Sequence, residues 1–154
     1  MRYLTLLLFL VLCSCQDLQK EEPITDSEKQ IAKDLIQGVF DNIWSAADTT
    51  KLLKYHTPDF IILENGEVWD NDRIQQRNRR VLKRKHRPKR INKMNYISIE
   101  KYGESMQIAY WNDADFIEGD SLVNTLRWLE SALAVKTEQG WKLKMMHSTR
   151  VQNK

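Results

Sequence analysis

The sequence has 154 residues, of which 42% are hydrophobic and 29% charged, with a formal net charge of +3. This length and balance predict one folded domain with its own core, and they exclude a disordered or collagen-like chain. Both cysteines, Cys13 and Cys15, lie at the end of the first fifteen residues, so the rest of the chain forms neither disulfides nor thiolate metal sites.

The first fifteen residues, MRYLTLLLFLVLCSC, are typical of an export signal. An apolar run from Leu4 to Leu12 follows Arg2, and it is shorter than the ~20 residues that a membrane-spanning helix needs. The run ends in a segment, LCSC, that resembles the bacterial lipobox, which predicts that Cys15 becomes the lipid-modified first residue of the mature chain. An ordinary secretory signal with two incidental cysteines is the alternative.

A polar segment, residues 16–25, follows Cys15 and predicts a short tether between the lipid and the folded domain, which we assign to residues 26–154. Gln16 rather than aspartate follows Cys15, so the inner-membrane retention signal of enteric bacteria is absent. We therefore expect a lipid-anchored protein of the bacterial cell envelope, on the outer membrane facing the periplasm or on the cell surface.

Two helices are predicted at the start of the domain. Thr25 and Glu28 have the spacing of a capping box, and apolar residues recur at helical intervals from there to about Ala47. Asp48 is a suitable N-cap for a second, short helix. That helix must end before Pro58, because proline disfavours helical geometry in the residue that precedes it.

The segment DFIILENGEVWD, residues 59–70, predicts a β-hairpin. Asn65-Gly66 is a strong signal for a two-residue turn, which would pair Ile62 with Trp69. Asp70 or Asn71 can then cap a third helix that extends to about Arg87. This helix has few apolar positions, so most of its surface should face water.

From about residue 91 the sequence reads as strands separated by turns. Strands are expected near residues 91–102, 105–117 and 122–137, and a last strand follows Gly140. Helices followed by a meander of strands predict an α+β domain, in which a curled antiparallel sheet has the helices against one face.

A three-residue loop, Glu138-Gln139-Gly140, would join the last two strands and set Ser131 beside His147. One face of this hairpin then carries an apolar row that becomes polar at Ser131, His147 and Thr149, and we expect this row to face inward. The opposite face carries Trp128 among small residues and suggests a covered surface. A homodimer contact is one interpretation, and Trp128 lying under the Arg150 side chain is the other.

The order of these elements and several segments resemble the nuclear transport factor 2-like superfamily, in its SnoaL-like bacterial branch. The matching segments are DTTKLLKYHTPDF, IILENGEVWD and WLESALAVKTEQGWKLKMMHSTRV, within residues 28–151. The resemblance implies a cone of curved antiparallel sheet, closed by about three N-terminal helices, with an internal pocket and frequent homodimers. Members include isomerases, cyclases, dehydratases and epoxide hydrolases, so the fold constrains function weakly.

The resemblance places Trp44, Tyr55 and Trp69 around the mouth of the pocket. His56 can face the same pocket or bind a free carbonyl at the end of the short helix. His147 is either the polar anchor of the pocket or a core histidine satisfied by Ser131. The predicted ligand-binding residues are Trp44, Tyr55, His56, Trp69, Tyr110, Ser131, His147 and Thr149.

Catalytic residues are harder to assign. Enzymatic members usually carry an inward aspartate with a partner across the pocket, whereas the aspartates here suit turns, caps or an outward strand face: Asp59, Asp70, Asp113 and Asp115. Two histidines with Glu64 or Glu67 would offer metal ligands, but their spacing does not support a metal site. We predict no metal and no cofactor.

Ten lysines or arginines and no acidic residue lie between Arg77 and Lys93, whereas the rest of the mature chain has 13 basic and 21 acidic side chains. This basic segment lacks aromatic residues for stacking on bases, so nucleic acid is not an expected partner. Anionic membrane headgroups are the expected partner, because lipid on Cys15 would hold the domain near a bilayer. A solvated basic helix face is the alternative.

These observations favour a lipid-anchored domain whose pocket binds a small, partly apolar ligand, with no reaction assigned. One alternative is a lyase, isomerase or hydrolase that uses His147 as its general base. The other is a structural or protein-binding lipoprotein whose cavity is filled by its own side chains.

Overall fold

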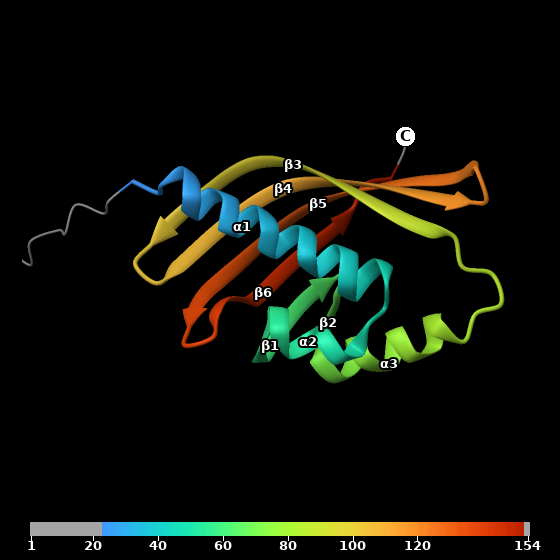
Figure 1. Cartoon of the computed structure of the whole chain (residues 1–154), viewed down its shortest axis with the longest axis horizontal. Coiled ribbons are helices and arrows are strands. Elements are labelled where there is room, and N and C mark those ends of the chain that lie inside the picture. The colour runs from blue at the N-terminus through green and yellow to red at the C-terminus, as the bar shows by residue number, and fades with distance from the viewer. Residues whose placement is uncertain (1–22, 153–154) are drawn as a thin grey trace, which may run out of the picture.

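The computed structural model describes residues 23–152 (Figure 1). The predicted signal peptide, residues 1–15, and residues 16–22 of the predicted tether lie outside the described residues. Within residues 23–152, no helix is both long enough and apolar enough to cross a membrane.

Helix α1 (Asp26–Val39) begins with the predicted capping box, in which the Thr25 hydroxyl accepts from the Glu28 amide and the Glu28 carboxylate accepts from the Thr25 amide. The chain then continues as a π-helix, η1 (Phe40–Ser45), which the sequence pattern did not predict. The π-helix leaves the carbonyl of Ile43 to an external donor, the buried side-chain amide of Asn78, at 2.8 Å.

The remaining helices are short. As predicted, Asp48 caps the 3-10 helix η2 (Thr49–Lys51), which leads into α2 (Leu52–Tyr55). Asp70 caps α3 (Asn71–Leu82), which ends five residues earlier than the predicted Arg87. The reason is that Val81 is the last buried side chain of this helix, so a further turn would have no packing to stabilise it.

Six strands form one curved sheet in the order β2-β1-β6-β5-β4-β3: β1 (His56–Glu64), β2 (Glu67–Asp70), β3 (Lys89–Tyr102), β4 (Ser105–Glu118), β5 (Ser121–Thr137) and β6 (Gly140–Arg150). The predicted pairing of Ile62 with Trp69 is confirmed. The sheet is mixed rather than purely antiparallel, because β1 lies parallel to β6. The predicted α+β class, a curved sheet with three helices, is confirmed.

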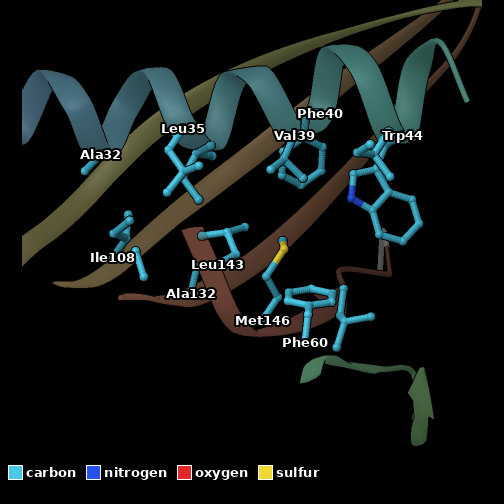
Figure 2. Packing of buried hydrophobic residues seen from close by; sticks show 14 of the residues in the cluster. Ala32, Leu35, Val39, Phe40, Trp44, Phe60, Ile108, Ala132, Leu143 and Met146 are labelled. Atoms are coloured by element: carbon cyan, nitrogen blue, oxygen red, sulfur yellow. The ribbon is translucent and has the colours of Figure 1, made fainter. Parts of the chain in front are cut away.

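The core lies between α1 and the concave face of the sheet (Figure 1). Figure 2 shows the helix side chains pointing toward Ile108, Leu143 and Met146 of the strands. Helix α3 packs on β1 and β2, at the end of the sheet where η1 ends. The core therefore fills the middle of the cone. The end of the cone next to the C-terminal end of α1 is closed by η1, α3 and the β1–β2 hairpin.

The β5–β6 hairpin differs from the prediction in its turn and in which face points inward. Its turn has two residues, since Thr137 pairs with Gly140, and a β-bulge at Lys144 then shifts the register by one residue. The pairing of Ser131 with His147 is as predicted, but the faces are exchanged: Glu130 and Ser148 are buried, while His147 is exposed. The bulge explains the error, because it lets Leu143 and Met146 share the inner face, which strict alternation does not allow.

The face that carries Trp128 is covered, as predicted, but it is covered by the chain itself. Trp128 is buried on the concave side of the sheet, and the Arg90 guanidinium lies 4.8 Å from its ring centre. Neither a second copy nor Arg150 is needed to cover it. The homodimer itself stays a prediction.

Candidate functional site

A cavity of about 130 Å³ lies at the closed end of the cone, between η1, α3, the β1–β2 hairpin and the inner face of β3, β5 and β6. Four aromatic rings and five polar side chains line this chamber: Phe40, Trp44, Trp69 and Trp128, with Glu64, Arg77, Arg90, Glu130 and Ser148. A wider groove of about 720 Å³ lies beside the start of β5, but almost all of its lining residues are exposed. The chamber is therefore the candidate site, because it alone of the two contains buried ionisable groups.

Glu130 is the acidic residue of the chamber whose pKa is shifted most. It projects inward from β5 and accepts hydrogen bonds from the Ser148 hydroxyl at 2.8 Å and from the Asn112 side-chain amide at 3.2 Å. Burial raises its pKa to about 7, although both hydrogen bonds favour the ionised form. A carboxyl group that is half protonated near neutral pH can donate or accept a proton.

Glu64, at the end of β1, lies opposite Ser148 in the sheet and is the second acid of the chamber. Burial raises the pKa of its carboxyl group as well. Negative charge on Glu64 also favours the protonated form of Glu130. The two carboxyl groups thus disfavour each other's ionisation.

Two arginines enter the chamber from separate elements. Arg77 on α3 lies 5.0 Å from the Trp44 ring centre and donates to the Asn78 side chain at 2.8 Å. Arg90 on β3 lies 4.8 Å from the Trp128 ring centre and donates to the Asn92 side chain at 2.8 Å. Burial and then the nearby Arg90 charge lower the pKa of Arg77 to about 10, so its guanidinium remains charged at neutral pH. Burial also lowers the pKa of Arg90, whereas the charges of Glu130 and Glu64 raise it.

Neither guanidinium has a close carboxylate partner. Among the described residues, no Asp or Glu oxygen lies within 4.0 Å of a side-chain nitrogen of Arg77 or Arg90. Each guanidinium offers five N–H donors, of which the amide side chains use one. The chamber therefore presents free donors next to aromatic surfaces, which suits an apolar molecule that carries a negative or hydrogen-bond-accepting group.

The structure brings together only two of the predicted ligand-binding residues, Trp44 and Trp69. Tyr110 is fully buried in the core, where it packs edge-on against Phe40 with ring centres 6.3 Å apart. Tyr55 and His56 lie outside the chamber lining. Tyr55 accepts a hydrogen bond from the Asn42 side chain.

His56 is fully buried and takes neither of its predicted roles. Its Nδ1 atom forms a hydrogen bond with Asn71 Oδ1 at 2.9 Å, and its ring stacks on Phe60 at 3.8 Å. Burial lowers the pKa of His56 to about 4, so its imidazole is neutral at physiological pH. His56 thus joins β1 to the start of α3.

The other predicted residues, Ser131, His147 and Thr149, lie on the convex face of the sheet, away from the chamber. The prediction that His147 faces inward is wrong, and a proton acceptor for chemistry in this chamber would be Glu130. Within residues 23–152, no group of three or more His, Cys, Asp or Glu side chains could hold a metal ion.

The sequence pattern predicted none of the five polar chamber residues as ligand-binding residues. Glu130 alternates with Trp128, Ala132 and Ala134, and a single acid in an apolar row was a usable signal. That signal was lost when the two faces were exchanged. Arg77 and Arg90 were hidden among ten basic residues, and nothing in their local pattern separates them from their exposed neighbours.

No protein-family model matches the sequence, and no curated protein matches it. Solved structures do match the fold. A protein of unknown function with a cystatin-like fold from Nostoc punctiforme has a TM-score of 0.69 at 13% identity, covering 86% of this chain and 97% of that chain. The CamKII hub homology domain of Chlamydomonas reinhardtii has a TM-score of 0.66 at 16% identity, covering 83% of this chain and 100% of that one.

An NTF2-like protein from Cytophaga hutchinsonii has a TM-score of 0.61 at 14% identity, covering 80% of this chain and 98% of that chain. These likenesses confirm the predicted nuclear transport factor 2-like fold. At such low identity they establish the fold alone, so function must be argued from the chamber.

The raised pKa of Glu130 implies that the free energy of unfolding depends on pH. Folding disfavours the charged form, so the folding free energy that Glu130 costs is small below pH 4.5, grows as the pH rises from 4.5 to about 7, and stays constant above that. We expect Glu130→Gln to be more stable than wild type at pH 8, by roughly 2 to 3 kcal/mol, and close to wild type near pH 4.5.

Urea unfolding at the two pH values measures this difference. Glu138→Gln, in the exposed β5–β6 turn, is the matched control and should change stability little at either pH. A Glu130→Gln protein with the same stability relative to wild type at both pH values would contradict a buried carboxyl group with a raised pKa.

Proposed function

We propose that the chamber binds a small, partly apolar organic anion, with the anionic group on Arg77 and Arg90 and the apolar part among the four aromatic rings. The observation that carries this proposal is the pair of half-buried guanidiniums that face an aromatic cavity with no carboxylate oxygen of residues 23–152 within 4.0 Å of either one. A buried charge without a close counter-ion costs folding free energy, and an anionic ligand would offset that cost.

The size and chemistry of the chamber restrict the ligand. A cavity of roughly 150 Å³ can hold one benzene molecule, and this chamber measures about 130 Å³. Guanidinium groups bind carboxylates and phosphates through two parallel hydrogen bonds. A ring-sized apolar group with one acidic substituent, such as benzoate, is therefore a suitable probe.

Glu130 would make this binding depend on pH. The groups that face it are Glu64 from β1, Arg90 from β3, Tyr110 and Asn112 from β4, and Ser148 from β6. When ionised, Glu130 repels a bound anion, and when protonated it can donate a hydrogen bond to that anion. Affinity should therefore rise as the pH falls through about 7.

Replacement of a chamber arginine tests the proposal. We expect Arg90→Gln to weaken benzoate binding at pH 6 at least about 10-fold, because it removes a buried charge-assisted hydrogen bond. Isothermal titration calorimetry measures the affinity. Arg79→Gln is the matched control, since Arg79 is exposed on α3 and does not line the chamber.

Two outcomes would contradict a ligand-binding chamber. One is a wild-type protein that binds no benzoate at millimolar concentration, which would favour a cavity serving only its own side chains. The other is an equal loss of affinity in Arg79→Gln and Arg90→Gln, which would indicate attraction by overall charge rather than a site.

We also propose that lipid on Cys15 anchors the domain to the bacterial cell envelope, with residues 16–25 as its tether. The sequence LCSC at the end of the apolar run supports this proposal. Exposed basic side chains near the end of α3, among them Arg79, Arg80, Lys83 and Lys85, would contact anionic headgroups from a tethered position.

Cys15→Ser tests the anchor, because the substitution removes the only predicted acylation site. We expect the variant to move from the membrane fraction to the soluble fraction, as measured by fractionation and immunoblotting at moderate salt. Cys13→Ser is the control and should remain with membranes. Recovery of Cys15→Ser with membranes at the wild-type level would refute the lipid as the main attachment.

A further inference from the structure

A second cavity of about 300 Å³ adjoins the chamber and shares four of its wall residues: Trp44, Arg77, Arg90 and Trp128. We call this second cavity the vestibule. It extends over the loop that joins α3 to β3, from which Arg84, His86 and Arg87 reach its wall. The wall also contains the apolar residues Val81, Phe116 and Leu126, so the vestibule is basic and partly apolar.

The vestibule concentrates positive charge. Four arginines line it, Arg77, Arg84, Arg87 and Arg90, and no aspartate or glutamate does. Burial and then repulsion from Arg90, Arg84 and Arg87 lower the pKa of Arg77, and the Glu64 charge opposes this repulsion only in part. An anion among them would relieve this repulsion.

The outer arginines lack acidic partners. Arg87 donates to the backbone carbonyl of Ser45, which fixes its position at the end of η1. Within residues 23–152, no carboxylate oxygen lies within 4.0 Å of a side-chain nitrogen of Arg84 or Arg87. Glu118 pairs with His86 at 3.5 Å, but Glu118 does not line the vestibule.

We infer that the vestibule and the chamber together bind a phosphomonoester, with the phosphate among the four arginines and the organic group in the chamber. This inference rests on the proposed function and names its ligand class. A carboxylate has two oxygens and one charge, which one or two guanidiniums satisfy. A phosphate monoester has three terminal oxygens and a charge near −2 at neutral pH, which matches a site of four guanidiniums.

A solvated basic surface explains the vestibule less well. Such a surface would carry its charges away from any cavity, as the exposed Lys83 and Lys85 do, since neither lines the vestibule. Arg84 and Arg87 are also exposed, but they line a hollow together with Arg77, Arg90 and the rings of Trp44 and Trp128. Convergence on a hollow is typical of a site for one molecule.

The test compares phenyl phosphate with benzoate in calorimetric titrations at pH 7. The protein is the full chain with Cys15→Ser, which removes the predicted lipid from the measurement. We expect phenyl phosphate to bind at least about 10-fold more tightly than benzoate. The double variant Arg84→Gln/Arg87→Gln should lose that advantage while still binding benzoate, because Arg77 and Arg90 remain.

Lys83→Gln/Lys85→Gln is the matched control, since it removes the same charge from the same loop without changing the cavity wall. Equal losses of phenyl phosphate affinity in the two double variants would overturn the inference. So would a wild-type protein that binds benzoate and phenyl phosphate equally. Failure of both probes to bind would instead refute the proposed function itself.

The phosphate can belong to a soluble molecule or to a lipid headgroup, and vesicles separate these sources. If the ligand is a lipid, phosphatidylcholine vesicles that contain phosphatidic acid should bind the same protein and compete with phenyl phosphate. If it is soluble, such vesicles should leave phenyl phosphate binding unchanged. Vesicle binding that depends on Lys83 and Lys85, but not on Arg84 and Arg87, would overturn the inference in favour of a general membrane surface.

Discussion

Burial of ionisable groups is the constraint on which the closed end of this domain depends. Transfer of a charge from water into a protein interior costs several kcal/mol unless a partner offsets it, and the chamber holds two guanidiniums and two carboxyl groups. The structure meets this cost in two ways. Glu130 keeps its proton over most of the acidic range, and the arginines lie over the faces of Trp44 and Trp128 with one amide acceptor each. What remains is excess hydrogen-bonding capacity for an anion.

The fold supplies the positions that this chemistry needs. The curved sheet brings β3, β5 and β6 around one hollow, and the long β5 sets Glu130 opposite Ser148 of β6. The π-helical end of α1 closes that hollow with Phe40 and Trp44, and Asn78 of α3 holds the π-helix in place through the Ile43 carbonyl. Arg77 precedes Asn78 in the chain, so the contact that fixes the helix also fixes one of the two chamber arginines.

Much of this fold could be predicted from local signals. The capping box at Thr25, the Asn65-Gly66 turn and the Asp70 cap depend on neighbouring residues only, and each has a sequence signature. The site was harder to predict than the fold, because its residues depend on which face of β5 and β6 points inward. Leu143 and Met145 alternate along β6 and therefore predicted that the row with His147 faces inward. The bulge at Lys144 instead places Leu143 and Met146 on the inner face. A bulge has no reliable signature in a single sequence, and one such residue moved His147 out of the site and Glu130 into it.

An anion that binds beside Glu130 in the chamber should favour the protonated carboxyl group, and proton uptake on binding measures this effect most directly. Titration of benzoate at pH 7, in buffers with different ionisation enthalpies, gives the number of protons taken up. With a Glu130 pKa of about 7, the wild-type protein should take up about half a proton per benzoate bound. Glu130→Gln should bind benzoate with no uptake, and His86→Asn, which changes the exposed vestibule histidine, should retain the wild-type uptake. Benzoate binding without proton uptake by the wild type, or the same uptake in Glu130→Gln, would contradict the account.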